Sequence, residues 1–183
     1  GQDIRVIIIK LADRLHNMRT IDAMSPQKQR DKSVETLEIY APIAHRLGIR
    51  SVKEELEDLA LKHLDPIAYK EINNLLALRK QHREQILEEI KQRIETRLHE
   101  VMPNTQMAFQ GRVKSIYGIY RKMYMQGKDF DEIYDIYAIR IITDTVADCY
   151  NILGVMHDMF RPIPNRFKDY ISTPKPNMYQ SLH

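Results

Sequence analysis

The stretch GRVKSIYGIYRKM, residues 111–123, lies where the chain has just changed from helices to a mixture of strands and helices. Residues 105–113 alternate between apolar and polar side chains, which predicts a strand that ends inside this stretch. Residues 115–125 have helical spacing and are closed by Gly127, so a helix is predicted directly after the strand. The boundary between the two halves of the chain is therefore expected near residue 104.

Downstream of this stretch the same mixture continues. Residues 136–143 are rich in β-branched side chains and predict a second strand, and residues 146–160 predict another helix. The final residues, 166–183, contain two prolines and predict a loop that leads into a further strand beginning at residues 179–183.

Upstream of residue 104 the apolar residues recur at three- or four-residue steps, which is the spacing of helices. Ser51 and Glu54 have the spacing of a capping box, and Asp65-Pro66 is a helix start signal. The predicted helices cover residues 4–19, 31–47, 51–63 and 65–101. We therefore predict an α+β chain, all-helical at first and then β-α-β-α-β.

Composition excludes several classes of protein. The chain has 183 residues, and its 28 Lys and Arg against 25 Asp and Glu leave a net charge of +3, too small for a nucleic-acid coat or a membrane-surface protein. The single cysteine, Cys149, cannot form an internal disulfide, which favours a reducing, cytoplasmic location. The longest apolar run near the start, residues 6–9, is far too short to span a membrane.

Three cations lie just before or within the predicted helix at 115–125. Arg112 and Lys114 lie two residues apart at the end of a strand and share a face, and Lys122 follows two helical turns later. The N-terminus of that helix offers free amides and a partial positive charge, so the group suits a polyphosphate. An ordinary solvated cationic surface is the alternative.

Asp135 lies at the mouth of the strand predicted at 136–143. A carboxylate there could hold Mg²⁺, which takes one or two protein carboxylates and completes its shell with phosphates and water. A strand-leading cap or an ion pair with Arg140 is the alternative. One carboxylate is not a metal site, so a second acid is expected elsewhere. Asp144 and Asp169 are more simply explained as caps or ion-pair partners.

The stretch RFKDYISTPKPNMYQSLH, residues 166–183, has the side chains of a nucleotide loop. Tyr179 could present its ring to a base, while Lys175 and His183 reach phosphates. Asn177 could serve in a turn or as a bidentate hydrogen-bonding group. The alternative for Tyr179 is an edge-strand tyrosine with its hydroxyl in water.

In VIIIKLADRLHNMRT, residues 6–20, Asp13, His16 and Asn17 share one helix face beside the apolar stripe. A carboxylate and an imidazole could form part of a metal site, but one helix face offers too few ligands to complete it. Polar residues on a helix surface are the alternative.

Taken in order, these stretches resemble the RelA/SpoT homologue family, bifunctional enzymes that make and degrade (p)ppGpp. KLADRLHNMRT resembles the last metal-binding helix of the HD-type hydrolase domain, GRVKSIYGIYRKM and DIYAIR resemble the start of the synthetase domain, and residues 166–183 resemble its guanosine-nucleotide segment. The resemblance implies hydrolase helices at 1–64, a linking helical region at 65–103, and the first half of a nucleotidyltransferase-like mixed sheet at 104–183.

The resemblance also implies a reaction, the transfer of the β,γ-pyrophosphate of ATP to the 3′-hydroxyl of GDP or GTP. For the synthetase it implies Arg112, Lys114 and Lys122 on ATP phosphates, Asp135 on Mg²⁺, Tyr179 stacked on guanine, and Lys168, Lys175, Asn177 and His183 around the acceptor nucleotide. For the hydrolase it implies Asp13 as a ligand of Mn²⁺ and Asn17 near the (p)ppGpp substrate. Contacts with a ribosome or with regulatory partners would involve domains outside these residues.

The resemblance further implies that the sequence is a piece of a longer protein, because the other hydrolase ligands would precede Gly1 and a second synthetase acid would follow His183. The piece alone is expected to be inactive. Two positions depart from the family pattern: Met178 stands where glycine is usual, and Gly118 where serine is frequent. The alternative function is a non-catalytic regulatory or RNA-binding module.

Overall fold

A computed structural model describes residues 3–183, and for residues 81 and 82 it describes the backbone alone. The chain forms two compact units. The first comprises Gly1–Leu78 and Lys114–Tyr134, and the second comprises Arg79–Val113 and Asp135–His183. The predicted α+β class is confirmed, since in residues 3–183 the helices come first and the strands follow residue 104. The compact units divide the chain differently from the predicted domains, which stay a prediction.

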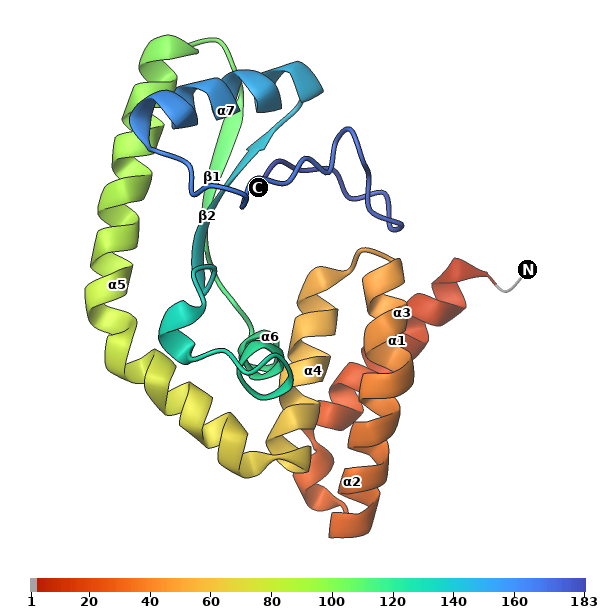
Figure 1. The fold of residues 1–183 in the computed structure, drawn as a ribbon. Helices are drawn as coiled ribbons and strands as arrows, with labels where there is room; N and C mark the ends of the chain where they lie inside the picture. The colour runs from red at the N-terminus through yellow and green to blue at the C-terminus, as the bar shows by residue number, and fades with distance from the viewer. Residues whose placement is uncertain (1–2) are drawn as a thin grey trace. The chain divides into compact units, whose positions relative to one another are not determined.

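The first unit is a bundle of helices (Figure 1). Its helices are α1 (Ile4–Arg19), α2 (Pro26–Glu35), α3 (Ala41–Arg46), α4 (Arg50–Leu64), the start of α5 (Pro66–Val101) and α6 (Ile116–Tyr120), with short turns η1 (Ile21–Ala23), η2 (Thr36–Tyr40), η3 (Arg121–Met125) and η4 (Phe130–Glu132). Leu11 and Met18 of α1 pack with Leu56 and Ala60 of α4 in its core. The apolar stripe predicted along residues 4–19 is thus partly buried against α4.

The predicted start of the second helix was wrong. Helix α2 begins at Pro26 rather than near residue 31, because a proline is harmless in the first turn, where its missing N–H has no partner to lose. The π-helical segment η2, which is wider than an α-helix, then precedes α3, whose second residue is Pro42. A proline inside a helix removes a donor and crowds the preceding turn, which accounts for the irregularity there. Gly48 follows with φ +72°, as a helix-terminating glycine does.

The capping box predicted at Ser51 was also wrong. Helix α4 begins one residue earlier, at Arg50, and Ser51 lies inside it. Glu54 instead accepts a hydrogen bond from Arg50 Nε at 2.7 Å. The start signal at residues 65 and 66 is confirmed, since Asp65 Oδ1 accepts the Ala68 N–H at 3.0 Å at the beginning of α5.

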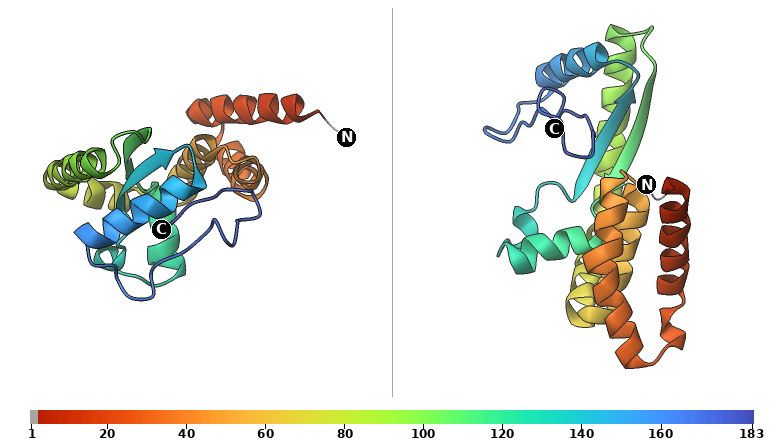
Figure 2. Two further views of the ribbon diagram at one scale, coloured as in Figure 1. Left: turned by 90° about the horizontal axis from the view of Figure 1, so that it is seen from above. Right: turned by 90° about the vertical axis from the view of Figure 1, so that its right-hand side faces the viewer.

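The second unit contains the sheet. Strands β1 (Met107–Val113) and β2 (Tyr137–Thr143) lie side by side and antiparallel, with Gln110 opposite Arg140 (Figure 2). Helix α7 (Val146–Met159) packs with α5 and the strands around Ile94, Leu98 and Ile152. Of the third strand predicted at 179–183, the described residues form only an isolated bridge between Asp169 and Leu182. The larger mixed sheet stays a prediction.

Within residues 3–183, none of the helices has both the length and the apolar composition needed to cross a membrane.

Candidate functional site

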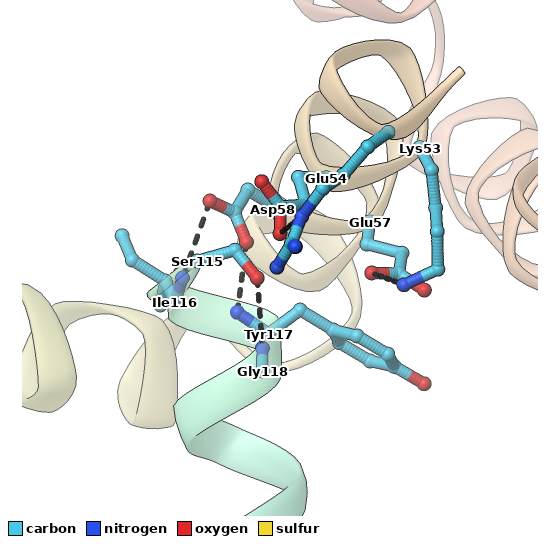
Figure 3. A network of polar contacts seen from close by, with 9 residues as sticks. Lys53, Glu54, Glu57, Asp58, Ser115, Ile116, Tyr117 and Gly118 are labelled. Carbon is cyan, nitrogen blue, oxygen red and sulfur yellow. Dashed lines mark hydrogen bonds and ion pairs between the residues drawn. The ribbon is translucent and has the colours of Figure 1, made fainter. Parts of the chain in front are cut away.

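The first turn of α6 is held by a carboxylate from α4. Asp58 accepts the N–H of Ile116 on Oδ2 at 3.2 Å and the N–H of Tyr117 on Oδ1 at 2.7 Å (Figure 3). The N–H of the next residue, Gly118, donates to Ser115 Oγ at 3.2 Å. The prediction that this helix start offers free amides to a polyphosphate was therefore wrong, because all three amides already have partners.

Burial raises the pKa of Asp58 to about 6, although its two amide hydrogen bonds act in the opposite direction. The carboxylates of Glu57 and Glu54 on the same helix raise it further. Burial also raises the pKa of Glu57, opposed by the Lys53 ammonium at 3.0 Å and by Arg121 of η3. Tyr69 of α5 interacts electrostatically with Asp58, and Tyr117 of α6 with Glu57, while burial is the main cause that raises the pKa of each phenol.

Sequence reasoning missed Asp58. It lies 58 residues before Ile116, its first partner, in an acidic helix where the neighbouring Glu54, Glu55 and Glu57 have the same general pattern. The signal that separates Asp58 from these neighbours is its burial under α6, which depends on tertiary packing.

The pKa of Asp58 predicts a pH dependence of stability. Because the pKa is raised in the folded state from 3.8 to about 6, the protonated form is favoured there, and this contribution is complete below pH 4 and lost as the pH rises through 6. Its size is about 3 kcal/mol at about 1.4 kcal/mol per pH unit. Urea unfolding at pH 4.5 and 7.5 should show the wild-type free energy of unfolding falling relative to that of Asp58→Asn. A constant difference between the two proteins would show that Asp58 does not titrate in this range.

The side chain of Lys114 runs along the same turn of α6. A Cβ atom placed on Gly118 would lie 3.2 Å from Lys114 Cγ, 3.3 Å from its Cε and 2.9 Å from Ser115 Oγ. The absence of a side chain at Gly118 therefore gives Lys114 room to lie across the turn. A serine at position 118 would bring its Cβ atom against the side chains of Lys114 and Ser115.

The predicted phosphate and metal ligands are divided between the two compact units. Lys114 and Lys122 belong to the first unit. Arg112 belongs to the second, on β1 opposite Ala138, and Asp135 is exposed two residues before β2 begins. Their convergence on one triphosphate stays a prediction.

The C-terminal segment folds back on itself within the second unit. The N–H of Lys168 donates to the carbonyl of His183 at 2.8 Å, and the N–H of His183 donates to the carbonyl of Lys168 at 2.9 Å. Tyr170 and Ser181 add a third backbone hydrogen bond at 2.9 Å. Residues at the two ends of the predicted nucleotide loop are thus brought together.

The side chains of this loop form one cationic and aromatic cluster. Lys175 Nζ lies 4.2 Å from the centre of the Tyr170 ring and 5.5 Å from that of Tyr179. The Tyr170 and His183 rings meet edge to face at 5.6 Å. Asn177 Oδ1 accepts the N–H of Tyr179 at 3.3 Å, as in the predicted turn, and its contact with a nucleotide stays a prediction.

Asp169 fixes the base of the loop. Its Oδ1 accepts the N–H groups of Ile171 and Ser172, both at 2.9 Å, and its Oδ2 accepts the hydroxyl of Tyr150 on α7 at 2.9 Å. The Ser172 amide is the largest of the effects that hold the pKa of Asp169 below its usual range. The capping role expected for Asp169 is confirmed. Tyr170 and Tyr150 were missed, because neither has a distinctive position in the sequence.

Met178 has a strained backbone. Its φ is +61°, in the left-handed region that glycine adopts without cost, and its side chain is 85% exposed. This is the position where the family resemblance implies glycine. The exposed side chain lies away from the core, so the methionine is tolerated there at the expense of backbone strain.

The candidates on α1, Asp13, His16 and Asn17, lie on the face opposite the buried Arg14. Asn17 Nδ2 donates to Asp13 Oδ2 at 3.2 Å on the exposed side. On the buried side Arg14 bonds Glu35 at 2.6 Å and lies 4.1 Å from the centre of the Tyr40 ring, which anchors α1. His16 is exposed, and no three metal-binding side chains gather among the described residues. Asp13 alone offers one carboxylate, which suits Mn²⁺ in kind but cannot complete its shell.

Two family models match the sequence. Residues 111–183 match a region found in RelA/SpoT proteins, and residues 1–50 match an HD domain. The segment between them, which contains Asp58, lies outside both matches.

Curated relatives match the whole chain. It is 54% identical to a Synechocystis protein named "Probable guanosine-3′,5′-bis(diphosphate) 3′-pyrophosphohydrolase", 50% to a Myxococcus xanthus protein named "GTP pyrophosphokinase", and 46% to "Bifunctional (p)ppGpp synthase/hydrolase RelA" of Mycobacterium tuberculosis. Each match covers 100% of this chain and 24% of the relative. The chain thus spans about a quarter of the length of these relatives.

Proposed function

Because the chain belongs to the RelA/SpoT family, we propose that it supplies the nucleotide-binding part of a (p)ppGpp synthetase and one metal-binding helix of the associated hydrolase. In this proposal the protein binds ATP, GDP or GTP, and (p)ppGpp in the cytoplasm. The observation that carries it is the loop at residues 168–183, which gathers Lys175, Tyr179 and His183 into one cluster around Tyr170.

The proposed synthesis is an in-line displacement. The 3′-hydroxyl oxygen of GDP or GTP attacks the β-phosphorus of ATP, and the bond from that phosphorus to the bridging oxygen of the α-phosphate breaks. The pyrophosphoryl group moves to the acceptor, AMP leaves, and the hydroxyl proton is released. Such transfers depend mainly on positioning and on neutralising charge, which is the task proposed for Arg112, Lys114 and Lys122.

Mg²⁺ is proposed to bind at Asp135. The carboxylate precedes β2 and is exposed, as a metal ligand shared with a nucleotide must be. A single carboxylate fits Mg²⁺, which keeps waters and takes further oxygens from phosphates. When bound, the ion would neutralise charge on the triphosphate. Asp13 is proposed as one ligand of Mn²⁺ for hydrolysis, with Asn17 bonded to its side chain and near the substrate.

The acceptor loop is proposed to bind the guanosine nucleotide. Tyr179 is 36% exposed and would stack on the base, while the ammonium of Lys175 lies near enough to meet phosphate oxygens. Lys168 and His183, joined through their backbones, would line the rest of the site. Asn177 would line the same site, and its side chain also accepts the N–H of Tyr179 in the turn before that ring.

Tyr179→Ala is expected to raise the KM for GDP by about 5- to 150-fold, since stacking on a base is worth about 1–3 kcal/mol. Tyr179→Phe keeps the ring and should stay close to the wild type. Initial rates of the full-length protein, with GDP and ATP varied separately, measure the effect. An equal rise in the KM for ATP, or no rise in that for GDP, would remove the stacking role.

A further inference from the structure

We propose that Asp58 is a positioning residue for synthesis, which fixes the first turn of α6 and through it the side chain of Lys114. The inference rests on the proposed function for Lys114, but its structural step can be tested without any nucleotide. It assigns a role to a residue that lies between the two regions matched by family models.

Two backbone amides in the first turn of α6 depend on Asp58 for a hydrogen-bond acceptor. The N–H groups in the first turn of a helix have no partner within the helix. Asp58 supplies partners to two of them, Ile116 and Tyr117, from a different helix (Figure 3). Its carboxylate is the means by which α4 sets the position and direction of the backbone where α6 begins.

The side chain of Lys114 packs against the same turn of α6. Lys114 immediately precedes the N-cap residue Ser115, and its aliphatic chain lies against Gly118 in the turn that Asp58 holds. A shift of the turn must therefore move the lysine ammonium. Displacement of a positioned cation by about 1 Å costs a large part of its effect on a reacting group.

The geometry also explains why a carboxylate occupies this place. It is flanked by Glu54 and Glu57, and burial opposes its charge, so on stability alone a neutral side chain would be expected. The two amide donors are the groups that a carboxylate satisfies together and an asparagine does not, because the asparagine amide nitrogen would face one of them. The charged carboxylate of Asp58 is therefore explained by the two backbone amides of α6 from which it accepts hydrogen bonds.

The structural step is tested by hydrogen–deuterium exchange in the full-length protein. Asp58→Asn and Asp58→Ala should speed the exchange of the Ile116 and Tyr117 amides by about 10- to 100-fold, since a charged acceptor is lost. Exchange in the core of α4 should be unchanged, which shows that the variants fold. The control is Glu55→Gln on the same helix, whose carboxylate accepts from Arg19 at 2.5 Å and 2.8 Å. Unchanged exchange at residues 116 and 117 in both Asp58 variants would overturn the proposal.

The functional step is tested by kinetics of the same variants. Asp58→Ala should raise the KM for ATP roughly 10-fold and leave the KM for GDP unchanged, as expected for a displaced phosphate contact. Lys114→Met distinguishes a failure of the proposed role of Lys114 from a failure of the proposed role of Asp58. If it leaves the KM for ATP unchanged, the proposed role of Lys114 fails, and this inference with it. If Lys114→Met raises that KM and Asp58→Ala does not, Asp58 is overturned as a positioning residue while the proposed function stands.

Discussion

Asp135→Asn is expected to reduce (p)ppGpp synthesis by at least about 1,000-fold, because losing a metal ligand at the transferring group removes several kcal/mol at about 1.4 kcal/mol per tenfold. The substitution keeps the size of the side chain and removes its charge. The cations proposed for the phosphates remain, so the affinity for ATP should change little. Product formation by nucleotide chromatography and ATP binding by calorimetry, both with the full-length protein, separate the two effects.

The matched control is Asp144→Asn, at the opposite end of the same strand. Asp144 follows β2 and is exposed, as Asp135 is before it. The control variant should synthesise at the wild-type rate. Equal activity of the Asp135 and Asp144 variants would assign the metal to a different carboxylate and would favour a non-catalytic role for this region.

Asp13→Ala is expected to lower (p)ppGpp hydrolysis by at least about 100-fold and to leave synthesis unchanged, since it deletes one ligand of the proposed Mn²⁺. The stability of α1 should be preserved, because its anchor is Arg14, bonded to Glu35 on the buried face. The measurement is the release of pyrophosphate from (p)ppGpp with Mn²⁺ present, beside an assay of synthesis on the same preparation.

Asp31→Ala is the control for that experiment. Asp31 is an exposed acid on α2 that accepts a hydrogen bond from Gln27 at 2.8 Å, and it should leave both activities intact. Loss of synthesis together with hydrolysis in Asp13→Ala would indicate a folding defect or a shared site. Retained hydrolysis would exclude Asp13 as a ligand.

Local signals in the sequence predicted much of the fold. Asp65 with Pro66 marked the start of α5, and Gly127, predicted to close the helix before it, has a positive φ. These succeed because each depends on hydrogen bonds or dihedral angles within a few residues. Ser51 shows the limit, since its spacing to Glu54 fits a cap, yet the helix extends one residue further back.

The residue types of the candidate nucleotide loop could be read from the sequence, but the contacts that hold the candidate residues could not. The loop at 166–183 has its chemistry in its composition, and Lys175, Tyr179 and His183 do lie in one cluster. The partner of the α6 amides could not be predicted, because Asp58 reaches them across 58 residues of sequence. Tyr170 likewise gains its position from the return of the chain at Ser181.

The central proposal is that Arg112, Lys114 and Lys122 bind the phosphates of ATP and that Asp135 binds the accompanying Mg²⁺. The most direct test is a crystal structure of the full-length protein with Mg²⁺ and an ATP analogue whose α- and β-phosphorus atoms are joined by a methylene group. We predict that Arg112, Lys114 and Lys122 donate to phosphate oxygens and that an oxygen of Asp135 binds the ion. A triphosphate bound elsewhere, with these four side chains on separate surfaces, would contradict the account.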